Sequence, residues 1–135
     1  MFHPGEFELR TYVIANLTPI DAVALAALVW PDFREYRGGV FLRLGFDEAG
    51  VDAWFLSDGA TVSSVESMVN HFHLWEAFSA RSDEDRGALT SVGLVMRETW
   101  AAALASRFPS RVFEVVFSDD PVEYGPTVTF FSSEG

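Results

Sequence analysis

The sequence contains no cysteine and no lysine, and each absence excludes a kind of chemistry. Without cysteine the chain has no disulfide, no thiolate metal ligand and no cysteine nucleophile. Without lysine it has neither a Schiff-base amine nor the lysine of a Walker-type phosphate loop. All nine basic residues are arginines.

Positive charge and long apolar runs are also scarce. Nine basic residues against 20 acidic ones give a formal net charge of −11. Nucleic acids and anionic membranes are bound by basic patches, so we expect neither as a partner. The longest apolar run, Ala22 to Trp30, is shorter than the roughly 20 residues of a membrane-spanning helix, and the first residues lack the pattern of a signal peptide. We therefore expect a cytoplasmic protein.

Apolar and aromatic residues are abundant. They make up 49% and 15% of the 135 residues, which is enough burial to offset the entropy of ordering and excludes a disordered chain. No repeat, linker or low-complexity tract divides the sequence. The length suits one folding unit, so we expect a single domain over residues 1–135.

Three capping motifs mark helix starts at Thr18-Pro19-Ile20-Asp21, Ser63-Ser64-Val65-Glu66 and Ser82-Asp83-Glu84-Asp85. The periodicity of apolar residues predicts the other elements. In order, the expected elements are a strand over 6–14, a helix over 19–30, a hairpin of 40–46 and 51–56, helices from 63 and from 82 to 108, and strands over 111–118 and 127–131. This order favours the α+β class, with an antiparallel sheet of about five strands covered by about three helices.

The helix over 19–30 is apolar on every side except at Asp21. Such a helix is either deeply buried or packed against another subunit, and full burial is difficult in so small a domain. The pattern therefore predicts self-association, as a homodimer. Tryptophan is enriched at interfaces. The expected interface residues are Ile20, Val23, Ala27, Trp30 and Trp75.

One segment, Val69-Asn70-His71-Phe72-His73-Leu74-Trp75-Glu76, combines residues that could do chemistry. His71 and His73 are the candidate metal ligands, and with Asn70 and Glu76 they are the candidate catalytic residues of a metal-assisted or acid–base enzyme. In a strand, His-x-His would place both imidazoles on one face.

The apolar spacing upstream of this segment predicts a helix instead. On a helix the two histidines diverge by about 200° and cannot share an ion, so they would converge only if the helix ended near Phe72. In the structural alternative, one histidine caps or hydrogen-bonds within the fold and the other faces solvent.

Acidic residues cluster at Asp47-Glu48, Asp83-Glu84-Asp85 and Asp119-Asp120 with Glu123. Paired carboxylates can act as acid and base or bind Mg²⁺ or Ca²⁺. Each cluster falls at a turn or a helix start, however, where acids cap helices and aid solubility, and we favour that interpretation.

The strings WPDF, over 30–33, and VNHFHLWEAF, over 69–78, resemble segments of small uncharacterised bacterial proteins. The resemblance covers about half of the chain and implies no activity, cofactor or site residue.

Our leading hypothesis is a bacterial protein-interaction module that self-associates and does not catalyse a reaction, with no cofactor and with any further partner unidentified. One alternative is a hydrolase-like enzyme centred on His71 and His73, with a divalent metal ion as cofactor in its metal-assisted form. Another is an acidic decoy of a basic partner.

Overall fold

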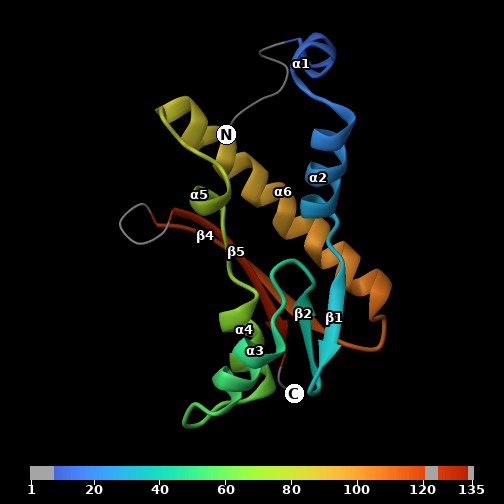
Figure 1. The fold of residues 1–135 in the computed structure, drawn as a ribbon, viewed down its shortest axis with the longest axis vertical. Coiled ribbons are helices and arrows are strands. Elements are labelled where there is room, and N and C mark those ends of the chain that lie inside the picture. Colours follow the sequence, from blue (N-terminus) through green and yellow to red (C-terminus); the bar gives the residue numbers. More distant parts are fainter. Residues whose placement is uncertain (1–7, 121–124, 134–135) are drawn as a thin grey trace.

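A computed structural model describes residues 8–120 and 125–133, and one long helix runs diagonally through the elongated arrangement (Figure 1). The two N-terminal helices lie at one end, and a small hairpin with two short helices lies at the other. In chain order the elements are α1 (Leu9–Asn16), α2 (Pro19–Val29), β1 (Phe33–Tyr36), β2 (Gly39–Leu42), α3 (Glu48–Phe55), α4 (Val62–Val69), β3 (Phe72–His73), α5 (Leu74–Ala77), α6 (Asp83–Arg107), β4 (Phe113–Asp120) and β5 (Gly125–Ser132).

The segment expected to be the first strand is the helix α1. The prediction was wrong over 9–14, while its beginning, at residues 6 and 7, lies outside the described residues. Leu9, Thr11 and Val13 alternate as in a strand, but Leu9, Tyr12 and Val13 also have helical spacing. A segment this short does not separate the two periods.

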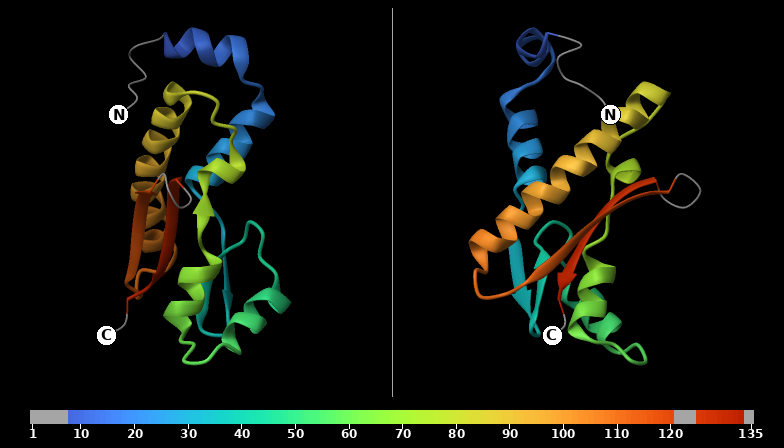
Figure 2. Two further views of the ribbon diagram at one scale, coloured as in Figure 1. Left: turned by 90° about the vertical axis from the view of Figure 1, so that its left-hand side faces the viewer. Right: turned by 180° about the vertical axis from the view of Figure 1, so that it is seen from behind.

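The helix α2 begins and ends close to where the sequence predicts. The Thr18 hydroxyl accepts the Asp21 N–H at 3.1 Å, and the Asp21 carboxylate accepts the Thr18 N–H at 2.9 Å, which closes the expected capping box. Pro19 occupies the first turn, where its missing N–H costs nothing. At its far end α2 packs against α6 (Figure 2).

A hairpin forms near the expected place but with different strands. β2 pairs antiparallel with β1, and both turn residues, Arg37 at φ 52° and Gly38 at φ 83°, lie in the left-handed region that tight hairpins need. The expected returning strand over 51–56 was wrong, because most of it belongs to α3. The Asp47 carboxylate accepts the Gly50 N–H at 3.1 Å and starts that helix.

The helix expected from residue 63 starts at Val62 and is capped by Thr61 rather than by Ser63. It ends at Val69, and Asn70 is its C-terminal cap residue. The chain then enters the short strand β3. The expected continuation of this helix through both histidines was therefore wrong.

The C-terminal half follows the sequence pattern closely. Ser82 caps α6 by accepting the Asp85 N–H at 3.1 Å, and the helix ends before Phe108. β4 and β5 form the expected hairpin, although residues 121–124 of its acidic loop lie outside the described residues. α6 covers one face of this hairpin (Figure 2).

The α+β class is confirmed, but the layout is not the expected one. The described residues contain six helices and two small antiparallel sheets, β1-β2 and β3-β5-β4, in place of one five-stranded sheet under three helices. Part of the reason is that two of the expected strands are helices.

Two apolar clusters form the core. The larger lies between α6 and the three-stranded sheet, where Trp100 and Phe130 meet edge to face with ring centres 6.0 Å apart. The smaller cluster is centred on Phe41, Val51 and Val65 and joins the hairpin to α3 and α4. α1 and α2 contribute no buried residue to either cluster.

Candidate functional site

Four of the five expected interface residues lie along one line of α2 and just beyond it. Ile20, Val23, Ala27 and Trp30 follow each other at intervals of three, four and three residues, and we call them the α2 stripe. All four are exposed, with Ile20 at 80%, Val23 at 70% and Trp30 at 54%. The stripe is therefore an apolar surface that nothing within the described chain covers.

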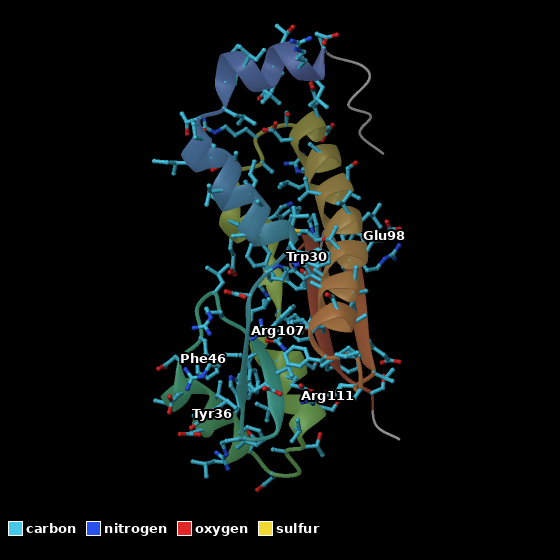
Figure 3. The ribbon with its side chains drawn as sticks, turned by 90° about the vertical axis from the view of Figure 1, so that its right-hand side faces the viewer. Trp30, Tyr36, Phe46, Glu98, Arg107 and Arg111 are labelled. Atoms are coloured by element: carbon cyan, nitrogen blue, oxygen red, sulfur yellow. The ribbon has the colours of Figure 1, made fainter. Side chains whose placement is uncertain are left out.

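Only the C-terminal end of α2 is held against the rest of the fold, and residues 19–27 are all exposed. Leu28 packs against the larger core cluster, and its carbonyl accepts the Trp100 indole N–H at 2.9 Å. These contacts hold the C-terminal end of α2 against α6. Trp30 follows at the end of the helix (Figure 3).

α1 extends the apolar surface. Leu9, Tyr12, Val13 and Ile14 are all exposed, and α1 meets α2 at a bend of 118°. Among the described residues, no single helix is long and apolar enough to cross a membrane, and only this bent pair reaches that length and composition. The surface carries few charges: among residues 8–30, only Glu8, Arg10 and Asp21 have side chains that are charged at pH 7.

A shallow apolar cavity adjoins the stripe. It has a volume of about 250 Å³, and Ala27, Leu28, Leu44, Phe72 and Trp100 contribute to its wall. Leu44 is itself exposed. The cavity lies where α2, the end of β2 and the core meet, so the exposed stripe continues into a recess at its C-terminal end.

The fifth expected interface residue, Trp75, lies elsewhere. It is on α5, which packs against β5 and α6, and its ring lies on Gly125 so closely that a Cβ there would stand 2.4 Å from Trp75 Cε2. Its indole N–H is buried, with no hydrogen-bond acceptor among the described residues. The structure does not bring Trp75 to the α2 stripe.

His71 and His73 come together because α4 ends before them. Their ring centres are 5.7 Å apart with planes inclined by 37°. His71 Nδ1 contacts the carbonyl oxygen of Ser67 in the last turn of α4. His73 Nδ1 lies 3.0 Å from the hydroxyl of Thr127 on the neighbouring strand.

The other two residues of that constellation do not join the histidines. Glu76 is exposed on α5. Asn70 is completely buried, and its amide accepts the Leu42 N–H at 3.0 Å and donates to the carbonyls of Val40 at 3.0 Å and Phe130 at 3.3 Å. Asn70 thus bridges β2 and β5, the adjacent strands of the two sheets.

Glu66, one turn before Asn70, has a structural role that differs from the capping role that the sequence predicts for it. Its carboxylate is fully buried and accepts the Val40 N–H at 2.8 Å, the Ser132 N–H at 2.8 Å and the Ser132 hydroxyl at 2.9 Å. The Arg111 guanidinium lies 3.8 Å away and also donates to the Gly38 carbonyl at 3.1 Å. Because these backbone donors belong to β2 and β5, one strand from each sheet, Glu66 links the two sheets.

The acidic clusters serve local structure in the described residues. Glu48 pairs with Arg34 at 3.0 Å, Arg86 pairs with Asp83 at 2.8 Å, and Asp119 accepts the Thr90 hydroxyl at 2.8 Å. Glu123 lies outside the described part. Within that part, no three histidine, aspartate or glutamate side chains are grouped so that they could hold a metal ion.

Comparison with known proteins gives no family for this chain: no family model, no curated protein and no solved structure matches it.

Proposed function

We propose that the protein is a self-associating interaction module, and that two copies pair through the α2 stripe and the neighbouring face of α1. The observation that carries this proposal is the exposure of Ile20, Val23 and Trp30 on a helix that contributes no buried residue to its own fold. An apolar helix gains stability only where it is covered, and here the covering surface has to come from another molecule.

The size of the exposed surface supports a protein interface. We take the full area of one side chain as roughly 170 Å², near the lower end of the range for aromatic side chains. With the exposed fraction of each residue, the large apolar residues of α1 and α2 together with Trp30 then expose about 800 Å² to water. A stable complex buries about 800 Å² per partner, so we expect both helices to take part.

The spacing of the stripe favours a second copy as the occupant. Intervals of three and four residues form the seam by which two helices pack side by side. In an antiparallel pair around a twofold axis near residue 25, Ile20 would face Trp30 of the partner subunit and Val23 would face Ala27 of the partner subunit. Val23 then meets the small side chain of Ala27, while the two large side chains, Ile20 and Trp30, pack against each other, and the same patch serves both subunits.

Charge favours the same occupant over a membrane surface. A helix that lies on an anionic bilayer has basic residues along its polar face, and residues 8–30 contain one arginine and two acids. The excess acid of the chain lies outside this region, so pairing two copies here brings few like charges together.

The test is sedimentation equilibrium of wild type and of a double variant, Ile20→Asp with Val23→Asp. We expect wild type to form a dimer of about twice 15.0 kDa and the variant to dissociate at least 100-fold more readily. Each lost apolar side chain is worth about 1.5–3 kcal/mol and counts twice in a twofold interface.

A matched control replaces Leu56 and Val112 with aspartate. These residues are 85% and 71% exposed and lie outside α1 and α2, so the control should dimerise as wild type does. Circular dichroism should show folded protein for both variants, because all four positions are exposed in the single chain. A wild-type protein that stays monomeric at high concentration would contradict the proposal.

A further inference from the structure

One long strand edge of the described fold is open. The strand order of the larger sheet is β3-β5-β4, so β4 pairs with β5 on one side and meets no strand of the described chain on the other (Figure 2). β3, at the opposite margin, has two residues, and β1 and β2 have four each, whereas β4 has eight. The edge of a sheet presents backbone N–H and C=O groups to which another extended chain can bond.

The strand register shows which backbone groups of β4 face this edge. The Ser133 N–H donates to the Val112 carbonyl at 2.9 Å, so the residues of β4 that bond to β5 are every second one counted from 112. The N–H and C=O groups of Phe113, Val115 and Phe117 therefore point outward, and no described residue bonds to them. The side chains of these three residues pack against the larger core cluster, which holds the strand in place.

β4 lacks most of the features that protect an edge strand. Proteins commonly use proline, lysine, a bulge or a very short strand for this purpose. β4 contains neither proline nor lysine, and its eight residues pair one to one with β5, without a bulge. Its charged residues are all acidic: Glu114, Asp119 and Asp120. These acids repel the same strand of a second copy and attract a basic segment.

The intervening side chains of β4 face the side of the sheet that α4 covers. Val116 is paired with Thr129, whose hydroxyl donates to the Ser67 carbonyl of α4 at 3.0 Å. Glu114 and Val116 share this face, because alternate residues of a strand point the same way. Both are exposed, with Val116 at 42%. A strand beside β4 could therefore cover an apolar side chain and meet a carboxylate on one face.

Glu114 also borders an open cleft of about 450 Å³ between the start of α4 and the end of β5. Apart from Phe131, the other residues that line the cleft are serines and threonines. Glu114 forms no ion pair with a described residue. The cleft thus combines hydroxyl oxygens and one unneutralised carboxylate, which suit a guanidinium or ammonium group.

We propose that the open edge of β4 binds an extended, basic segment of a partner protein as an additional antiparallel strand. The backbone of this segment bonds to the outward groups of Phe113, Val115 and Phe117. One of its basic side chains reaches Glu114, and an apolar side chain covers Val116. A second copy is disfavoured, because its own β4 carries the same acids and no base. The inference does not depend on self-association through α2.

The probe is a capped peptide whose sequence follows from the register, Arg-Thr-Thr-Val-Thr-Arg-Thr. Antiparallel to β4, it places its first arginine across from Asp119, its valine across from Val116 and its second arginine across from Glu114. Threonine fills the other positions because it favours the extended conformation. A matched peptide carries N-methyl groups on its third and fifth residues, which removes the two N–H donors that would face Phe117 and Val115.

Amide hydrogen exchange of the full chain, followed by NMR, reports strand addition residue by residue. In the free protein, the amides of Phe113, Val115 and Phe117 should exchange faster than those of Glu114 and Val116, which bond to β5. We expect a saturating amount of the peptide to slow the three outward amides at least tenfold, and the N-methylated peptide to leave them unchanged.

Three results would overturn the proposal. The first is peptide binding that leaves the three outward amides unprotected, and the second is no binding at millimolar peptide. The third is protection that appears without peptide and grows with protein concentration, which would assign the edge to a second copy.

A pair of variants tests the role of the carboxylate. Glu114→Gln should weaken peptide binding about fivefold, which is the upper range for one exposed ion pair. Glu98→Gln removes the same charge from an exposed position on α6 and should leave the affinity unchanged. If both variants weakened binding equally, the attraction would come from the overall charge of the protein, and the assignment of a basic side chain to Glu114 would be wrong.

Discussion

Replacing Glu66 with glutamine tests how the two sheets are joined. In the native fold, one carboxylate oxygen accepts the Ser132 N–H and the other accepts the Val40 N–H and the Ser132 hydroxyl. Glutamine has nearly the same shape but only one acceptor oxygen. Whichever way its amide is turned, one buried backbone N–H faces an NH₂ group and loses its acceptor.

The magnitude follows from those contacts. A buried donor left without an acceptor costs about 1–3 kcal/mol, and hydrogen bonds to a neutral amide are about 1 kcal/mol weaker than those to a charged carboxylate. Removing a buried charge offsets part of this loss. We therefore expect Glu66→Gln to lower the free energy of unfolding by about 2–3 kcal/mol, a large share of the 5–15 kcal/mol of a typical domain.

Equilibrium unfolding in urea, followed by tryptophan fluorescence and circular dichroism, measures this difference. With a slope of about 1–3 kcal/mol per molar urea, the midpoint should fall by about 1–2 M. Glu98→Gln, which changes an exposed carboxylate on α6 (Figure 3), should stay within about 0.5 kcal/mol of wild type. If Glu66→Gln and Glu98→Gln were equally stable, the account of Glu66 as the link between the sheets would be wrong.

Two further predictions concern packing and titration. Gly93→Ala should destabilise the protein, because a Cβ there would stand 2.5 Å from the Phe117 ring. Gly87→Ala in the same helix places its Cβ where nothing lies within 4 Å, and should stabilise the protein by about 0.5–1 kcal/mol. Thermal melts of the two variants test this difference, and equal melting temperatures would refute the prediction. The hydrogen bond to Asp52 raises the pKa of Tyr36 above its ordinary 10.0, and the same bond, with that from Arg37, lowers the pKa of Asp52. Stability from Tyr36 is therefore present below pH 10 and lost as pH rises through the raised pKa, while stability from Asp52 is lost as pH falls through its lowered pKa, below about 3.8. Phenolate absorbance should show Tyr36 titrating above pH 10 in wild type and earlier in Asp52→Asn; an unchanged titration would refute the assignment.

Local capping chemistry predicted the starts of two helices, α2 and α6. Thr18 and Asp21 close the capping box of α2, and Ser82 begins α6, because these contacts depend only on residues three positions apart. The β4–β5 hairpin could also be predicted, since apolar and polar residues alternate in both strands along one short stretch of chain.

Segments whose apolar residues fit both the strand and the helix period could not be assigned correctly from the sequence. Leu9 and Val13 suit a strand or a helix, and the segment from Val51 was assigned to a strand although Asp47 could cap a helix ahead of it. The end of α4 was also missed. Asn70 ends that helix while bonding to β2 and β5, contacts that depend on residues 28 to 60 positions away.

The candidate sites divide in the same way. The α2 stripe could be predicted because an apolar helix without a polar face is visible in sequence alone. The approach of His71 to His73 could not, because it depends on where α4 ends. The sequence pattern assigned Glu66 to a capping box, and its buried role was missed because a carboxylate in a helix is ordinarily exposed and only the fold reveals the backbone donors around it.

Self-association through α2 is the central claim, and the dimer dissociation constant tests it most directly. Sedimentation equilibrium should give similar constants for wild type and for the Leu56→Asp, Val112→Asp control, with a constant at least 100-fold larger for Ile20→Asp, Val23→Asp. A dimer that forms equally well in all three proteins would place the interface elsewhere and contradict the claim.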